Sequence, residues 1–218
     1  MKAIAVKENR RIDAVAARFT GSDRFLKLIE RIRTDVPDCV TVTGLAGSTP
    51  SLLISSLYNT LTRPILVVTE GPDEASHLYD DLAALMGENQ VGHFPARQIL
   101  PYDFRAPVGE ILGRRISTLS TLVSGHLPVT VCSVRSLMEP TIDIDFLRSS
   151  QVSFRRGAEI DLDDLIDRLV QLGYRRVPIV EEVGDFAVRG GLIDLFTPGA
   201  ESPIRVELFG DEVDTIRE

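Results

Sequence analysis

Apolar segments of strand length alternate with amphipathic segments of about 12–15 residues over the first two thirds of the sequence, and this alternation restricts the fold more than any other feature. The predicted elements, in chain order, are helix 22–33, strand 39–43, helix 50–61, strand 65–69, helix 72–86, strand 91–94, helix 110–124 and strand 129–132. Such alternation is typical of βαβ units, which build a parallel sheet with helices on both faces. Because crossovers are right-handed, it predicts an α/β fold with a doubly wound parallel sheet, Rossmann-like or P-loop NTPase-like.

The pattern changes near residue 146, and we place a domain boundary there, between residues 1–146 and residues 147–218. The second part begins with a predicted strand at 152–155 and a helix at 161–172. Further strand-like segments follow without an intervening helix, at 185–189, 192–196, 204–209 and 213–217. Gly190-Gly191 separates the first two of them, which is a signal for a hairpin turn. The second part is therefore predicted to be a smaller α+β domain with an antiparallel sheet.

Charge and composition narrow the class of protein. Hydrophobic residues make up 44% of the chain, enough for a packed core, and the net charge is −8. Residues 147–218 carry nine basic and fifteen acidic side chains, a net charge of −6, which leaves −2 for residues 1–146. Neither part has the basic excess of a typical duplex-binding module. We therefore do not expect strong DNA binding by this chain alone.

Several kinds of site and location are disfavoured. No apolar run approaches the roughly 20 residues that span a bilayer, and the N-terminus lacks the apolar core of a secretory signal. Cys39 and Cys132 each fall in a predicted buried strand, where cysteine behaves as a small hydrophobic residue. The three histidines are scattered, and no Cys/His pair has the spacing of metal ligands. We expect a monomeric chain in a reducing, cytoplasmic compartment, with no metal and no membrane partner.

The loop before the predicted helix 50–61 lies where an α/β fold binds phosphate. It reads Gly44-Leu45-Ala46-Gly47-Ser48-Thr49-Pro50-Ser51. A working P-loop reads G-x-x-x-x-G-K-[ST], and in this register Thr49 replaces the second Gly and Pro50 replaces the Lys. The phosphate loses its fixed positive charge, and Pro removes a backbone N–H from the cradle. A degenerate P-loop and a generic strand-to-helix loop both explain the glycines, and in either case we expect no ATP hydrolysis and no cofactor.

Other catalytic candidates are weaker. Ser48 lacks the G-x-S-x-G elbow and a positioned His. Glu181, Glu182 and Asp185 are close in sequence, but an acidic loop in a domain of net charge −6 is more often a solvated face than an acid/base pair. Residues 95–109 form a predicted long loop with three prolines, and loops of this length are often functional.

Three stretches together resemble a known family. They are VTGLAGSTPSLL at 42–53, LPYDFRAPVGEILGRRISTLSTL at 100–122, and LGYRRVPIVEEVGDFAVRGGLIDLF at 172–196 with PIRVELFGDEVDTIR at 203–217. The last is the most specific, because its order and spacing continue over nearly fifty residues. These stretches resemble the N-terminal UvrB-like module of the Mfd family, the bacterial transcription-repair coupling factors, over about residues 36–218. UvrB shares the third stretch but has an intact P-loop, so Pro50 favours the Mfd family.

The resemblance implies a function. In that family the first domain of this module is of nucleotide-binding type but does not hydrolyse ATP, and the second domain binds UvrA. The motor domains that contact RNA polymerase and DNA lie downstream, and the chain resembles a fragment that stops after the second domain. The resemblance therefore implies a non-catalytic module that recruits UvrA to lesions marked by stalled RNA polymerase in nucleotide excision repair. The alternatives are a UvrB-type ATP-dependent damage-recognition subunit and a DNA-binding module.

The resemblance also implies which residues contact UvrA. Arg176 matches the Arg of Y-x-R and Arg189 the Arg of V-R-G, whereas a third position, Ala187, lacks the arginine found in UvrB. Phe196 is an apolar neighbour, and Arg175 is a further candidate. Strand alternation places Arg189 on the outer face of its strand, where exposed arginines near an aromatic are typical interface anchors. For each arginine alone, a salt bridge within the domain is the competing interpretation. Possible DNA contacts in a UvrB-like path are Arg105, Arg114 and Arg115.

Overall fold

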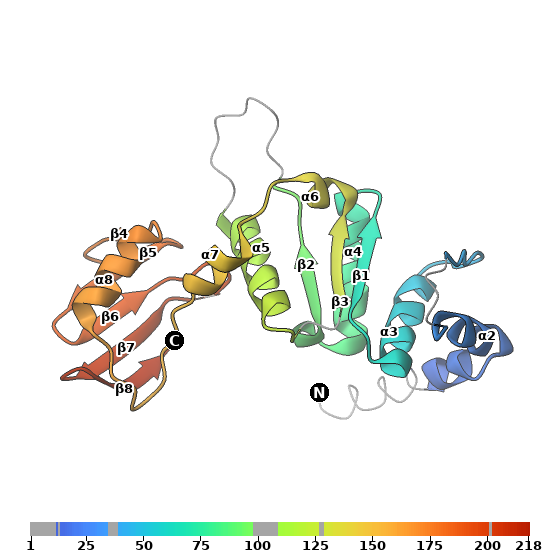
Figure 1. Ribbon diagram of the computed structural model, residues 1–218, viewed down its shortest axis with the longest axis horizontal. Coiled ribbons are helices and arrows are strands. Elements are labelled where there is room, and N and C mark those ends of the chain that lie inside the picture. The colour runs from blue at the N-terminus through green and yellow to red at the C-terminus, as the bar shows by residue number, and fades with distance from the viewer. Residues whose placement is uncertain (1–11, 13, 35–38, 98–108, 127–128, 201) are drawn as a thin grey trace. The chain divides into compact units, whose positions relative to one another are not determined.

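The structure is a computed structural model, and it describes residues 12, 14–34, 39–97, 109–126, 129–200 and 202–218 (Figure 1). The chain divides into two compact units, one within Met1–Pro95 and His126–Met138 and one within Ala96–Gly125 and Glu139–Glu218. This division differs from the predicted boundary at residue 146, because the helix after residue 108 groups with the C-terminal unit. Its Gly113 lies so close to Gly199 that an added Cβ would be 2.6 Å from the Gly199 nitrogen.

The elements of the first unit are α2 (Asp23–Ile32), α3 (Thr49–Leu61), β1 (Ile65–Thr69), α4 (Pro72–Met86), η1 (Glu88–Gln90), β2 (Val91–Phe94), β3 (Val129–Ser133) and α6 (Val134–Met138). Those of the second unit are α5 (Gly109–Val123), α7 (Ile144–Ser149), α8 (Leu162–Gln171), β4 (Arg175–Arg176), β5 (Asp185–Arg189), β6 (Leu192–Leu195), β7 (Ile204–Phe209) and β8 (Glu212–Arg217). Most of the predicted helices and strands are therefore confirmed, with shifts of one or two residues at their ends.

The first unit contains a parallel three-stranded sheet in the order β1-β3-β2 (Figure 1). Helix α4 packs on one face of it, where Ala75 and Leu82 meet Val91, Val129 and Val131 in a buried cluster. The predicted α/β class is thus confirmed. On the other face Leu66 and Val68 of the edge strand β1 are 58% and 46% exposed, whereas the residues beside them, Thr130 and Cys132 of β3 and Phe94 of β2, are buried.

The predicted strand at 39–43 is wrong, because residues 39–46 have no regular secondary structure. Cys39 is exposed, as is Val42, whereas Cys132 is buried in β3 as expected. The β-branched sequence CVTVT favours extended backbone, but a strand also needs a neighbour for its N–H and C=O groups. The predicted P-loop NTPase-like arrangement needs a strand at this point, and among the described residues that strand is not formed.

The predicted helix at 22–33 is confirmed as α2, which packs against α3. Ser22 caps α2 by accepting a hydrogen bond from the Phe25 backbone N–H. Phe25 and Ile29 form a small buried cluster with Leu53 of α3. Residues 14–20 are also helical.

The second unit is organised around a five-stranded sheet in the order β4-β5-β6-β7-β8 (Figure 1). Helix α8 covers one face, and Leu165 and Leu169 pack against Phe186, Ile193 and the other residues of a buried core. Asp161 caps the start of α8 through the backbone N–H groups of residues 163 and 164. Its end is closed by Gly173, which has φ +86°, and by hydrogen bonds from residues 173 and 174 back to residues 170 and 169.

Two predictions about this unit are wrong. Residues 152–155 are not a strand, although Val152 and Phe154 still pack on the core, so the alternating pattern reflected burial rather than pairing. The sheet is mixed instead of antiparallel, because β4 runs parallel to β5. The chain between them is a loop rather than a crossover helix, and the edge strand contains only two residues.

A search of the described helices for one long and apolar enough to cross a membrane finds none.

Candidate partner-binding surface

The face of the five-stranded sheet opposite α8 is rich in arginine. In β5, Phe186 enters the core, so alternation directs Asp185, Ala187 and Arg189 to the opposite face. The neighbouring strands add side chains to this face in the same way. We call it the arginine face, defined by Arg175, Asp185, Ala187, Arg189, Asp194, Phe196, Arg205, Glu207, Thr215 and Arg217.

Asp194 of β6 is at the centre of this face and holds two arginines. Its carboxylate accepts a hydrogen bond of 2.6 Å from Nη2 of Arg189, and bonds of 2.6 and 2.9 Å from Nε and Nη2 of Arg205. The Asp194 side chain is only 12% exposed, whereas those of Arg189 and Arg205 are 56% and 47% exposed. The acid therefore lies beneath two guanidinium groups that reach the surface.

Asp194 and Arg205 shift each other's pKa. The hydrogen bond from Arg205 is the largest influence on Asp194, and with the help of Arg189 it holds the pKa of this carboxyl below its ordinary value despite the opposing effect of burial. In return the hydrogen bond to Asp194 raises the pKa of Arg205. Asp194 and Arg205 are therefore charged at neutral pH, and Asp194 fixes the positions of both arginines by charge-assisted hydrogen bonds.

Arg175 forms a second charged group at the β4 edge. Its guanidinium donates to Asp185 at 2.9 Å and to Glu182 at 2.9 Å. Burial raises the pKa of Asp185, but the hydrogen bonds from Arg175 and from backbone N–H groups outweigh it and leave the pKa lowered. The acidic loop was predicted to be a solvated face; Asp185 is instead buried and positions Arg175, while Glu182 remains largely exposed.

Arg176 and Arg189, the two arginines that match the family motif, lie on opposite faces of the sheet. Arg176 is in register with Phe186, so it leaves the sheet on the α8 side, whereas Arg189 is on the arginine face. Arg176 is exposed and makes no hydrogen bond or ion pair with any residue that the structure describes. Phe196 extends the pairing of β6 with β5 and, by alternation, lies half-buried on the arginine face with Arg175 and Arg189.

The Gly190-Gly191 turn fixes the position of Arg189. Gly190 has φ +59°, in the left-handed region that favours glycine. At Gly191 an added Cβ would be 2.7 Å from the carbonyl oxygen of Leu208, because the turn packs against β7. The hairpin predicted from this pair is thus confirmed. Gly190 is favoured by its left-handed backbone conformation, and Gly191 by its close approach to Leu208.

The candidate nucleotide loop adopts a turn before α3. Gly44 and Gly47 have φ of +81° and +55°, and Thr49 closes the turn by donating its N–H and hydroxyl to the Ala46 carbonyl. Ser48 is the residue before the helix but makes no capping hydrogen bond, and Pro50 is in the first turn, as predicted.

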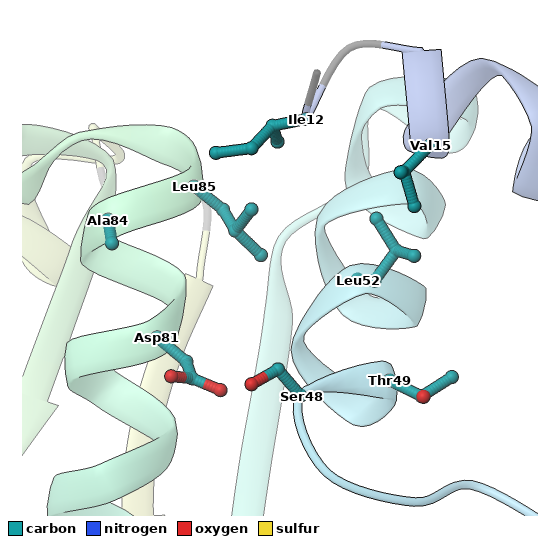
Figure 2. A pocket seen from close by; sticks show the side chains of 8 residues that line it. All are labelled: Ile12, Val15, Ser48, Thr49, Leu52, Asp81, Ala84 and Leu85. Carbon is teal, nitrogen blue, oxygen red and sulfur yellow. The ribbon is translucent and has the colours of Figure 1, made fainter. Parts of the chain in front are cut away.

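An acidic side chain faces this loop. Ser51, at the position of the P-loop Ser/Thr, is buried and donates a hydrogen bond of 3.1 Å to Asp81 of α4. Figure 2 shows Asp81 and Ser48 pointing toward each other across a pocket of about 500 Å³. The rest of its lining is mostly apolar, from Ile12, Val15, Leu52, Ala84 and Leu85 with Thr49. The carboxylate of Asp81 thus places a negative charge near the N-terminus of α3, where a bound phosphate would need a positive charge.

We therefore expect no saturable binding of ATP–Mg²⁺ at this loop in calorimetric titration at millimolar nucleotide. Pro50→Lys alone should not create a site, because the Asp81 carboxylate repels phosphate. Asp81→Asn in the Pro50→Lys background is the matched control, and weak binding that appears only there would identify the carboxylate as the cause. Saturable binding by the unaltered chain would instead support a UvrB-type ATP-dependent subunit.

The arginines considered for DNA binding differ from one another. Arg105 lies outside the described residues, as do residues 98–108 of the long loop. Arg114 is exposed and pairs with Glu110 on its own helix. Arg115 is 2% exposed and is bonded to Glu139, so it is unsuited to a DNA contact. Burial is the main cause of its lowered pKa, against the opposing attraction of Glu139.

Sequence reasoning missed three residues of these sites: Asp81, Asp194 and Arg205. Asp81 and Asp194 were counted only as charges of a helix and a strand. The alternation of IRVEL does put Arg205 on the outer face of its strand, but the pairing of Asp194 with Arg205 depends on the register across the 196–203 connection. Among the residues described, no group of three or more His, Cys, Asp or Glu side chains could hold a metal ion.

Comparison with known proteins assigns the five-stranded sheet to a known domain family. A family model described as the UvrB interaction domain matches residues 152–218, which contain the whole five-stranded sheet. The transcription-repair-coupling factor of Bacillus subtilis (strain 168) is 30% identical over 206 residues, 94% of this chain and 17% of that protein. That of Myxococcus xanthus is 32% identical over 209 residues, 93% of this chain and 17% of that protein.

A transcription-repair-coupling factor of Staphylococcus aureus (strain USA300) is 30% identical over 177 residues, 81% of this chain and 15% of that protein. The chain thus spans about a sixth of the length of the curated relatives that it matches. The family resemblance found in the sequence is confirmed by these matches: the chain belongs to the transcription-repair-coupling factor family and contains its UvrB interaction domain at residues 152–218.

Proposed function

We propose that residues 152–218 form a docking module for UvrA, and that the chain serves transcription-coupled nucleotide excision repair without being a catalyst itself. One observation carries this proposal: exposed arginines and a partly exposed phenylalanine are gathered at the β4–β6 end of a sheet face, inside the segment that matches the UvrB interaction domain. Arginine and aromatic side chains of this kind are the usual anchors of protein interfaces.

The side chains of this region favour binding over chemistry. Arg175 and Arg189 are held by buried carboxylates, and their own side chains are 63% and 56% exposed. The carboxylates Asp185 and Asp194 are already engaged by arginines, and their lowered pKa values make them poor general acids or bases at neutral pH. The arrangement is suited to holding a partner rather than to moving protons.

The proposed role in the whole protein follows from the relatives, which are named transcription-repair-coupling factors. We place the ATP-dependent translocase, and the contacts with RNA polymerase and DNA, in parts of the protein other than this chain. In this scheme the distal motor displaces stalled RNA polymerase and this module recruits UvrA to the lesion. The chain acts as a tether for UvrA, and this role requires no nucleotide at the loop that contains Pro50.

The first test is the affinity of the purified chain for purified UvrA. Arg189→Ala and Arg176→Ala should each weaken binding by about 2 kcal/mol, which is the size expected of an interface anchor. Arg176 is on the other side of the sheet but on an edge strand next to Arg175, so a partner that covers this edge contacts both. Isothermal titration calorimetry measures the change.

The matched control is Arg156→Ala, which removes an arginine of the same domain that is 78% exposed and only weakly paired with Asp214 at 3.7 Å. Its affinity for UvrA should equal that of the unaltered chain. Circular dichroism establishes that each variant is folded. Unchanged affinity in both Arg176→Ala and Arg189→Ala, with folding intact, would exclude these residues as anchors, and no binding by the unaltered chain would exclude the function.

A further inference from the structure

We infer that Arg205 is a second anchor for the partner, and that Arg189 and Arg205, fixed by the buried Asp194, form a two-arginine clamp for a carboxylate-bearing segment of UvrA. This inference rests on the proposed docking function. It adds a strand, β7, to the docking region. It also specifies the chemistry of the partner, since the clamp is built to receive acidic side chains.

The geometry of the clamp supports a binding role. Arg189 gives one N–H group to Asp194 and Arg205 gives two, and neither arginine has another bonded partner among the residues that the structure describes. A guanidinium has more donors than these, in a rigid planar fork. Because Asp194 lies beneath both groups, the remaining donors of the two arginines are available from the solvent side.

Fixing the two arginines lowers the cost of binding. A free arginine side chain loses rotamer entropy when it binds, whereas one held by an ion pair is already ordered. The single carboxylate of Asp194 also leaves the group of three with a net charge of +1. The clamp therefore attracts an anion even after its own acid is counted.

The charges of the surrounding domain favour a protein carboxylate over nucleic acid. Residues 147–218 carry a net charge of −6, so a phosphate backbone that extended beyond the clamp would meet repulsion. On the same face Glu207 and Asp185 alternate with Arg217 and Arg175. Such a mosaic fits a protein surface with carboxylates at particular positions, recognised at short range.

The test compares Arg205→Ala with Arg156→Ala in the full 218-residue chain, using purified UvrA and calorimetry. Arg205→Ala should weaken binding about tenfold or more, because an anchor is lost. Arg156→Ala is the matched control, because Arg156 is an arginine of the same domain that lies outside the arginine face, is 78% exposed and pairs with Asp214 at 3.7 Å. Its affinity should stay within about twofold of the unaltered chain, as for residues outside the anchor set.

Two further variants separate direct contact from an effect on folding or on Arg189. Arg205→Lys keeps the charge and can still pair with Asp194, so it should fold and bind with intermediate affinity. The double variant Arg189→Ala/Arg205→Ala should bind more weakly than either single variant. If the double variant equals Arg189→Ala, Arg205 only supports its neighbour, and the inference is overturned.

The class of partner is tested separately. Carbodiimide joins an amine to a carboxylate in contact, so Arg205→Lys mixed with UvrA should give a cross-link to an Asp or Glu of UvrA. A cross-link only to Asp194 contradicts direct contact. A duplex oligonucleotide that binds, loses affinity in Arg205→Ala and leaves UvrA binding unaffected assigns the clamp to DNA instead. Loss of binding in Arg189→Ala but not in Arg205→Ala overturns the clamp while the proposed function stands.

Discussion

Phe186→Ala is expected to lower the free energy of unfolding of the UvrB interaction domain by about 3–5 kcal/mol, the usual cost of deleting a buried aromatic ring. Phe186 has no exposed surface and packs on Leu165 and Leu169 of α8. The same strand carries Arg189, so the ring couples the core of the domain to the arginine face. Urea unfolding followed by circular dichroism measures the change.

A matched control lies in the same sheet. Phe209 ends β7 and is 85% exposed, so Phe209→Ala removes an identical side chain without opening a cavity. Its effect on stability should be within about 0.5 kcal/mol. A similar loss in both variants would contradict the core defined by α8 and β5. UvrA binding should fall in Phe186→Ala only to the extent that the domain unfolds, which distinguishes it from Arg189→Ala.

Much of this fold could be predicted from the sequence because periodicity reports burial directly. The helix with Leu165 and Leu169, its Asp161 cap and the Gly190-Gly191 hairpin all have local signals, and the structure confirms them. The wrong predictions occur where side chains are buried but the backbone does not pair with a neighbouring strand. Val152 and Phe154 are on the core without belonging to a strand.

Strand partners are a second limit of sequence reasoning. Residues 39–43 have high strand propensity, yet those described are exposed or half-exposed and unpaired, because propensity does not supply a neighbour for the backbone. In contrast β4 contains only two residues, Arg175 and Arg176, and is a strand because β5 lies beside it. A segment of two residues has no period that could reveal it.

Arg175, Arg176 and Arg189 of the candidate site were predicted from the sequence, but Arg205 and the carboxylates were not. Arg176 and Arg189 stand out in sequence because the family motif contains them, and Arg175 was a further candidate beside Arg176. The partners that hold Arg175 and Arg189, Asp185 and Asp194, depend on which residues face each other across strands. For Arg175 and Arg189 the salt bridge within the domain is present, and each pair still leaves the arginine side chain more than half exposed, so the proposed interface role is compatible with it.

Glu139→Ala is expected to be the other strongly destabilising change, at about 3–5 kcal/mol, because it removes the partner of a buried charge. Arg115 of α5 is 2% exposed and donates to Glu139 at 3.0 Å. The same carboxylate accepts the backbone N–H of Arg97 at 2.9 and 3.1 Å. One side chain thus ties together two segments of the C-terminal unit that are far apart in sequence.

Helix α5 also provides the control. Glu110→Ala breaks an ion pair with Arg114, the neighbour of Arg115, but both partners are more than half exposed. Its cost should be only about 0.3–0.5 kcal/mol, as for exposed pairs one helical turn apart. Adding Arg115→Met to Glu139→Ala should recover part of the lost stability, since the buried positive charge is then gone. Equal losses in Glu139→Ala and Glu110→Ala, measured by urea unfolding, would show that the buried pair does not hold the unit together.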